Sequence, residues 1–399
     1  MDKPPLIRRV VIHNYKSIAK CDVTLGRFNV FVGRNGSGKS NILDALQFVS
    51  DCLSTGSVSF ALEQRGGMQE TLRRCKNRPG SFRIELEVQL SAVVIQYSVE
   101  IESKPHGGFV VAEENCWRDG TENGRSFVDA FKCRRGKIEL STDETLPKSG
   151  VSEDRLLLPI VSSLPEFRAL YDVLSTVNLY NPMPPLMRLP HPLDAGASLR
   201  GSGSNLTGAV ARLSRDRPGT LQRIVEYLGQ IVPGLTGVQP LEIGGYEILE
   251  FQLQDSSDPK PLQFQAKNMS DGTMRSLAVL VAALQFLELP DSNQVIGIEE
   301  PETALHPAAM AVLLDALREA SVNTQILITT HSPDLLDRVD IETDSLFAVS
   351  NESGSTVIAP IDRASESAIR DHLYTPGELL RMDQLEPRID RPVEETSPQ

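Results

Sequence analysis

The hydrophobic positions of the chain follow two periods, which separate expected strands from expected helices. Apolar runs at Phe28–Val32 and Val295–Ile298 indicate buried strands, and alternation over Phe82–Leu90 indicates a strand with one buried face. Apolar residues at helical spacing predict a helix over 39–53. Further strands are expected at 6–13, 18–25, 93–101, 109–117, 177–180, 237–243, 246–254, 261–266, 325–329, 345–349 and 356–359, and further helices within 152–176 and at 205–214, 219–230, 272–289 and 307–320.

The order of these elements predicts an α/β fold in which both ends of the chain share one mixed sheet with flanking helices. A single domain is expected over 1–383, with a core lobe at 1–56 and 290–383, an inserted antiparallel β layer at 57–150 and a helical lobe at 151–289. Five prolines between Asn181 and Pro192 argue against regular structure there, and 195–204 is expected to be a flexible loop. The polar residues 384–399 are predicted to form a disordered tail.

The composition is that of an ordinary globular protein, with 40% hydrophobic and 23% charged residues. The formal net charge of −13 disfavours non-specific attraction to nucleic acid or to anionic membranes. Two basic patches run against this balance, one from Arg73 to Arg78 and one from Lys132 to Lys137. A solvated loop or strand face explains each patch more simply than a nucleic-acid contact does.

Cysteine usage and the N-terminus predict a cytoplasmic location without a membrane partner. The five cysteines include no C-x-x-C pair, so neither a zinc site nor a disulfide framework is indicated. Met1–Arg9 has no apolar core of the kind found in signal peptides, and no apolar run is long enough to span a bilayer.

A glycine-rich loop connects the apolar strand at Phe28–Val32 to the helix expected after it. Its residues match G-x-x-x-x-G-K-[ST], a pattern whose backbone N–H groups surround phosphates at a helix N-terminus. Lys39 can reach the β- and γ-phosphates of ATP, and the Ser40 hydroxyl can bind Mg²⁺. The residues expected to bind the nucleotide are Gly33, Arg34, Asn35, Gly36, Ser37, Gly38, Lys39, Ser40 and Asn41.

Two carboxylates end the apolar strand at Val295–Ile298, and a histidine ends the next one. The carboxyl ends of parallel strands line the ligand crevice of such sheets. Glu299 is expected to hold Mg²⁺, and Glu300 to orient or deprotonate the attacking water. His331 is placed to sense or polarise the γ-phosphate, so Lys39, Glu300 and His331 are the expected catalytic residues. A solvated strand end and a structural histidine are the simpler alternatives when each motif is taken alone.

A further motif, Ser270-Asp271-Gly272-Thr273, precedes a long apolar helix. Ser270 or Asp271 suits the N-cap, and Gly272 permits close approach of another backbone. From the residues alone, this is a helix start or a second anion-binding helix end.

The order of these four motifs resembles an ABC-type ATPase head, particularly the branch with the SMC, RecF and OLD-like proteins. The opening His13-Asn14-Tyr15-Lys16-Ser17-Ile18 and the ending Gly377-Glu378-Leu379-Leu380 are similar to small stand-alone ATPases of this branch that are labelled AAA family. The motif similarity covers about 6–50 and 265–350. The resemblance implies that Ser270 and Gly272 contact the γ-phosphate of ATP bound to a second subunit. It also implies that Glu300 is the catalytic base, that His331 is the switch histidine, and that 303–306 lies at the dimer interface.

The sequence departs from the family pattern in three places. Glu299 stands where the class usually has Asp, so hydrolysis is expected to be slow if the longer side chain alters the metal geometry. Asp271 stands where transporters usually have Gly. No Q-loop glutamine is evident, and Asn181 is a candidate substitute.

These features predict a cytosolic ATPase that forms a homodimer with ATP at the interface. Three roles remain open: a DNA-linked ATPase in repair or genome maintenance, an anti-phage ATPase that controls a separately encoded nuclease, and a nucleotide-gated scaffold with negligible turnover. A P-loop kinase would leave the motifs at Ser270 and His331 unexplained. The stretch after His331 is expected to be too short for the TOPRIM nuclease domain of OLD-like proteins.

Overall fold

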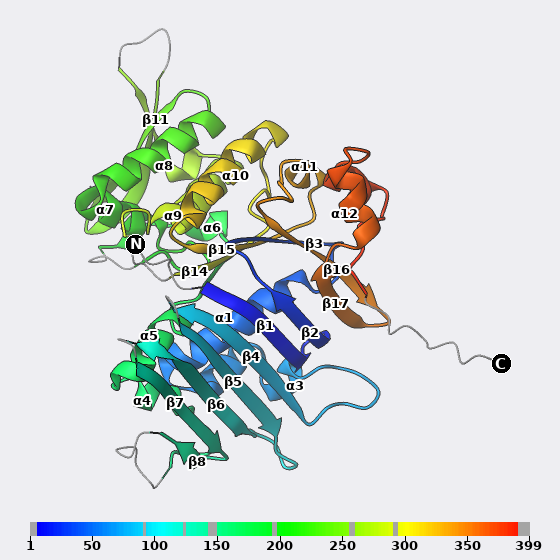
Figure 1. Ribbon diagram of the computed structural model, residues 1–399. Helices are drawn as coiled ribbons and strands as arrows, with labels where there is room; N and C mark the ends of the chain where they lie inside the picture. Colours follow the sequence, from blue (N-terminus) through cyan, green and yellow to red (C-terminus); the bar gives the residue numbers. More distant parts are fainter. Residues whose placement is uncertain are drawn as a thin grey trace, which may run out of the picture.

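One long mixed sheet runs through the molecule (Figure 1). The computed structural model describes residues 6–90, 93–122, 125–142, 150–193, 198–254, 260–289 and 294–389. Within these ranges, the strands of the long sheet are, in spatial order, β8 (Lys137–Ser141), β7 (Arg125–Arg134), β6 (Phe109–Glu122), β5 (Val93–Ser103), β4 (Ser81–Leu90), β1 (Leu6–Tyr15), β2 (Ile18–Thr24), β17 (Ser355–Pro360), β16 (Ser345–Glu352), β3 (Phe28–Val32), β15 (Gln325–Thr330), β14 (Val295–Glu299) and β9 (Asn178–Tyr180).

The strands that carry the predicted motifs are parallel neighbours in this sheet. β15 lies between β3 and β14, with Thr330 opposite Val32 and Thr329 opposite Glu299. β9 pairs with the other edge of β14. All residues of β3 and β15 are buried, as expected for strands covered on both faces. The segments that follow these strands therefore emerge at the same edge of the sheet, which confirms the predicted fold class.

The inserted strands extend this same sheet. β4 pairs with β1 in antiparallel register, with Ile84 opposite Ile12, and β5 to β8 continue outward from it. β7 and β8 were not expected from the sequence. β8 is the edge strand and its residues are exposed or only partly buried, so it carries a weak apolar pattern. The insertion is therefore continuous with the core through β1.

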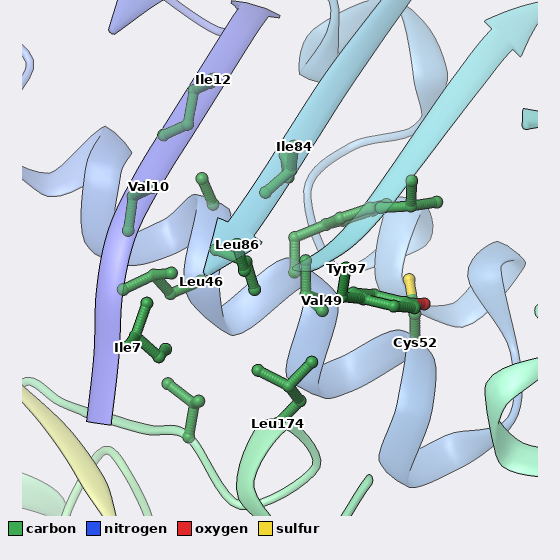
Figure 2. Close-up of a cluster of buried hydrophobic side chains, with 14 of the residues drawn as sticks. Ile7, Val10, Ile12, Leu46, Val49, Cys52, Ile84, Leu86, Tyr97 and Leu174 are labelled. Atoms are coloured by element: carbon green, nitrogen blue, oxygen red, sulfur yellow. The ribbon is translucent and has the colours of Figure 1, made fainter. Parts of the chain in front are cut away.

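One face of this extension forms a hydrophobic core beneath the helix that follows the glycine-rich loop. Figure 2 shows side chains of β1, β4 and β5 pointing toward Leu46 and Val49 of α1 (Lys39–Thr55) and toward Leu174 of α5 (Pro165–Leu174). The alternating residues of β4 supply one layer of this core. The β extension thus packs against one face of α1.

A second core is built around helix α9 (Asp271–Leu284), whose residues after Asp271 are all buried. α8 (Pro218–Ile231) and α10 (Pro307–Ser321) pack against it, and α7 (Leu206–Asp216) contacts both α8 and α9. α9 ends at Leu284 rather than at residue 289, because the following turn tightens to hydrogen bonds between residues three apart. A small antiparallel sheet lies beside α7, in the order β10 (His191–Pro192), β12 (Tyr246–Leu253) and β11 (Leu235–Ile243), with β13 (Leu262–Gln265) also paired to β12.

Two loop predictions are corrected. The proline-rich stretch 181–192 contains the one-turn helix α6 (Pro184–Met187) and the short strand β10, because prolines are tolerated in a first helical turn and on an edge strand. Of the flexible loop predicted at 195–204, residues 195–197 lie outside the described residues. The rest is anchored, since Gly201 accepts a hydrogen bond from Asn181 N (2.8 Å) and Leu199 is buried.

The end of the described chain is also held in place. Short helices not expected from the sequence follow β15 and β17: α11 (Pro333–Leu336), α12 (Arg363–Arg370) and α13 (Pro376–Arg381). Within the predicted disordered tail, Arg388 donates to Glu366 (2.6 Å) and its backbone N–H to Pro360 (2.8 Å), so order extends past residue 383. Residues 390–399 lie outside the described ranges. The remaining short helices are α2 (Val58–Glu63), α3 (Met68–Thr71) and α4 (Leu158–Val161).

Candidate nucleotide-binding site

The glycine-rich loop wraps the N-terminus of α1. Gly36 and Gly38 have φ angles of 78° and 98°, which residues other than glycine rarely adopt. Gly38 is also sterically constrained, because a Cβ there would lie 2.1 Å from Thr356 Oγ1. The Thr356 hydroxyl donates to the Ser37 carbonyl (2.7 Å). Because Thr356 lies on β17, this strand holds the loop in place.

Lys39 is buried at the centre of the loop with only neutral hydrogen-bond acceptors. Its ammonium donates to the carbonyl oxygens of Gly33 (2.8 Å) and Arg34 (3.1 Å). Burial lowers the pKa of Lys39, while the nearby Glu300, Glu302 and Glu299 favour its charged form. The Ser37 hydroxyl is buried and has no hydrogen-bond partner among the described residues. A buried cation, an unused hydroxyl and a glycine cradle fit an anionic phosphate chain.

Glu299 and Ser40, the two residues expected to hold Mg²⁺, lie near each other. The Glu299 carboxylate accepts a hydrogen bond from Asn181 Nδ2 (3.0 Å), and the Ser40 hydroxyl lies close enough to lower the pKa of Glu299. Burial is the main cause of the raised pKa of Glu299, and the adjacent Glu300 and Asp44 raise it further. A hydroxyl and a carboxylate at one point are the hard oxygen donors that Mg²⁺ prefers, so these residues fit that ion.

Glu300 and His331 also meet at the carboxyl edge of the sheet. Glu300 Oε1 lies 3.1 Å from His331 Nδ1, and both side chains are partly exposed. The Glu300 backbone has a φ of 43°, an uncommon conformation for a non-glycine residue, and its N–H donates to the Thr329 carbonyl (3.0 Å). The turn after β14 thus directs Glu300 toward the end of β15.

Glu302 is a further carboxylate in this site that sequence reasoning did not single out. It is 5% exposed and accepts a hydrogen bond from Thr330 Oγ1 (2.5 Å). Burial raises its pKa, and its charge favours protonated Lys39. The sequence does show Glu302 as the third glutamate of Glu-Glu-Pro-Glu. The turn after β14 is what directs its side chain into the protein.

The side chain of Asn41, a predicted nucleotide-binding residue, contacts the β1–β2 turn. Its side-chain amide donates to Ser17 Oγ (2.6 Å), and Ser17 in turn bonds Thr356 Oγ1 (2.6 Å). The neighbouring Lys16 pairs with Asp44 of α1 (2.6 Å). Asn41 therefore ties the β1–β2 turn to α1.

The Ser270 motif lies at the N-terminus of α9. Ser270 is the N-cap and accepts from Thr273 N (3.1 Å). Ser270 and Asp271 are exposed, and Asp271 pairs with Arg188 (2.5 Å). A Cβ on Gly272 would lie 2.4 Å from the Ala304 carbonyl, so the glycine is required for this helix to contact the turn after β14.

The second basic patch is largely paired with acidic neighbours, whereas one residue of the first patch has such a partner among the described residues. In the second patch, Lys132 and Arg134 both pair with Glu113 (3.2 and 2.6 Å), and Arg135 pairs with Glu102 (2.6 Å). In the first patch, Arg74 pairs with Glu70. This pairing fits the simpler explanation of a solvated surface.

Comparisons with known proteins find similarity to ATPase domains. Residues 6–131 match the family described as "AAA ATPase domain", and residues 186–337 match "AAA domain, putative AbiEii toxin, Type IV TA system". The chain is 40% identical over 53 residues to the DNA replication and repair protein RecF of Bacteroides thetaiotaomicron, a match spanning 13% of this chain and 14% of RecF. It is 24% identical to the OLD nuclease of Thermus scotoductus, over 92% of this chain and 66% of that protein.

A solved structure shows the same fold. The SMC head domain of Pyrococcus furiosus, crystallised with the C-terminal domain of ScpA, aligns with a TM-score of 0.52 at 14% identity, over 92% of this chain and 99% of that one. The chain therefore has the fold of the SMC head domain. Two of its segments are similar to AAA ATPase domains, and it has more distant similarity to RecF and to an OLD nuclease. In the described part of the chain, none of the helices combines the length and apolarity needed to cross a membrane.

Proposed function

We propose that this protein binds and hydrolyses ATP in the cytoplasm and acts as a nucleotide-driven dimerisation switch. The observation that carries this proposal is the convergence of Lys39, the Ser40–Glu299 pair and the Glu300–His331 pair at the ends of three neighbouring parallel strands. Phosphoryl transfer to water requires a phosphate cradle, a metal site and a base within reach of one another. These residues supply all three groups on one sheet edge.

Each residue has a distinct role in this proposal. Lys39 and the loop N–H groups bind the β- and γ-phosphates of the substrate ATP. Ser40 and Glu299 would hold Mg²⁺, which supplies charge neutralisation on the phosphates when bound. Glu300 accepts a proton from the attacking water, and His331, 3.1 Å away, orients the Glu300 carboxylate. Asn181 holds Glu299 from the side of β9.

The exposed N-terminus of α9 supports the dimer. Ser270 and Asp271 expose a helix start whose remaining residues are buried, and helix N-termini favour anions. The family resemblance assigns this motif to ATP on a second subunit. A two-fold dimer would then contain two composite sites, and hydrolysis would release the subunits.

Sedimentation velocity tests this proposal. Glu300→Gln should still bind ATP but accumulate as a dimer with ATP and Mg²⁺, whereas the same protein without nucleotide should remain monomeric. The matched control is the Glu300→Gln, Lys39→Ala double variant, which should stay monomeric with ATP. A Glu300→Gln protein that never dimerises would contradict the proposal.

The biological role that we propose is genome maintenance or anti-phage defence. Its support is the similarity to proteins named for DNA replication and repair and to an OLD nuclease. DNA-stimulated, salt-sensitive ATPase activity would favour the DNA-linked role. Copurification of Glu300→Gln with a nuclease in the presence of ATP would favour control of a separate effector.

A scaffold with negligible turnover is the second candidate. It is favoured by Glu299, whose longer side chain already bonds Asn181 and whose pKa is raised by burial. Turnover well above background that is abolished by Glu300→Gln would exclude it.

A further inference from the structure

Arg275 is a buried arginine in the second turn of α9, and it joins three segments of the candidate site. One terminal nitrogen donates to the Pro182 carbonyl (2.7 Å). The other donates to the carbonyls of Glu299 (3.0 Å) and Glu300 (3.2 Å), and more weakly to Asn181 Oδ1 (3.4 Å). Only 8% of Arg275 is exposed. A single guanidinium therefore bridges α9, the segment after β9 and the carboxylate turn after β14.

These contacts fix the backbone on which the carboxylates are mounted. Arg275 binds the main-chain oxygens of Glu299 and Glu300 and so holds the backbone without using either carboxylate as its acceptor. The same helix meets the following turn through Gly272, where a Cβ would lie 2.4 Å from the Ala304 carbonyl. The start of α9 and the carboxylate turn are consequently joined at two points.

An arginine suits this position better than a lysine does. Burial lowers the pKa of Arg275, while Glu300, Glu302 and Glu299 favour its charged form. A guanidinium stays protonated under such desolvation and donates in several fixed directions, whereas a buried lysine loses its charge more readily. The carbonyl acceptors around Arg275 lie on separate segments. A guanidinium, whose N–H groups point in several fixed directions, can reach them at the same time.

We propose that Arg275 is a positioning residue that couples the two half-sites of one subunit. Arg275 donates to the carbonyls of Glu299 and Glu300, so its position depends on the turn that carries Glu300, the proposed base for this subunit's own ATP. Through α9 it sets the position of Ser270 and Gly272, which serve the ATP of the other subunit. This inference rests on the composite dimer of the proposed function.

The test separates ATP binding from ATP-driven dimerisation in the Glu300→Gln background. Adding Arg275→Met should weaken dimerisation at saturating ATP and Mg²⁺ by at least about tenfold, because charge-assisted hydrogen bonds that align α9 are lost. The affinity of the monomer for a fluorescent ATP analogue should change by less than about threefold, since the bonds of Lys39 do not involve Arg275. Arg275→Lys should give an intermediate loss of dimerisation.

Arg212→Met is the matched control. Arg212 is a half-buried arginine on α7 whose pKa is also lowered by burial, and it donates to Gln285 at the other end of α9 (3.1 Å). Its loss should lower the unfolding temperature but leave dimerisation within about threefold of the parent.

Three outcomes would overturn the inference: dimerisation of Arg275→Met equal to the parent, equal losses of dimerisation in Arg212→Met and Arg275→Met, or a parallel loss of ATP affinity. Failure of the Glu300→Gln parent itself to dimerise would instead reject the proposed function, and with it this inference.

Discussion

The two regions that the proposal assigns to ATP differ in how far one subunit completes them. At the phosphate loop, Lys39 and Glu299 already have hydrogen-bond partners, from the loop and from the segment after β9. At the start of α9, Ser270 bonds within its own first turn and is exposed. The first region is preorganised by the sheet, and the second is a rigid helix end that presents an open surface. This difference is what a site shared between two copies requires.

Among the changes that test this difference, removal of the Lys39 ammonium should have the largest effect on ATP binding. Lys39→Ala deletes the buried ammonium in the phosphate cradle, so ATP affinity should fall by at least about 100-fold. Titration with a fluorescent ATP analogue measures this loss. Lys20→Ala, an exposed lysine on β2, is the control and should bind normally. Normal ATP binding by Lys39→Ala would refute the assignment of the phosphate loop.

Loss of the proposed base should affect turnover without affecting binding. Glu300→Gln retains the size of the side chain but cannot accept a proton, so turnover should fall about 100-fold or more. Phosphate release measures the rate, and ATP titration measures the affinity. Turnover that remained within threefold of the unmodified protein would exclude Glu300 as the base.

A change at the second region should act only after ATP has bound. Gly272→Ala places a Cβ 2.4 Å from the Ala304 carbonyl, so the start of α9 must shift. We expect turnover to fall about tenfold and ATP affinity in the monomer to stay within twofold, because the shift lies at the half-site used by the other copy. Gly80→Ala, where no atom lies within 4 Å of the added carbon, should change neither quantity. Equal losses of affinity and turnover would remove the distinction between the two regions.

The smallest effect on the site is expected from the β extension beneath α1. Glu114 is fully buried, accepts hydrogen bonds from Tyr97 (2.9 Å) and Leu158 N (3.0 Å), and has its pKa raised by burial to about 7. Because the folded protein holds this proton more tightly than the unfolded chain, stability should fall as pH rises from about 4.5 to 7, by about 3 kcal/mol.

Denaturant unfolding of the unmodified protein and of Glu114→Gln between pH 4.5 and 8 measures this contribution. The difference in unfolding free energy between the two proteins should shift in favour of the variant as pH rises, while ATP affinity remains unchanged. A difference that does not vary with pH would show that Glu114 does not titrate in this window.

Local sequence patterns determined the elements that carry the site. The run Phe28–Val32, the glycines after it and the helical spacing that follows specify strand, loop and helix within a few residues of each other. A helix start capped by Ser270 or Asp271 was likewise predicted, because either side chain can accept from the first free N–H groups of a helix, and Ser270 is the N-cap. Such features depend on neighbours in the chain, so the sequence alone was sufficient.

Only the tertiary structure decided which distant groups meet. It turned Glu302 inward, engaged Asn41 with Ser17, and placed the Arg275 guanidinium against the carbonyls of Glu299 and Glu300. It also joined the strands of the predicted inserted β layer to β1, a pairing that the sequence did not specify. These contacts depend on sheet order and on the turn after β14, which no local periodicity encodes. The sequence thus determined the glycine-rich loop and the other motifs, and the fold decided how the start of α9 is connected to the carboxylate turn after β14.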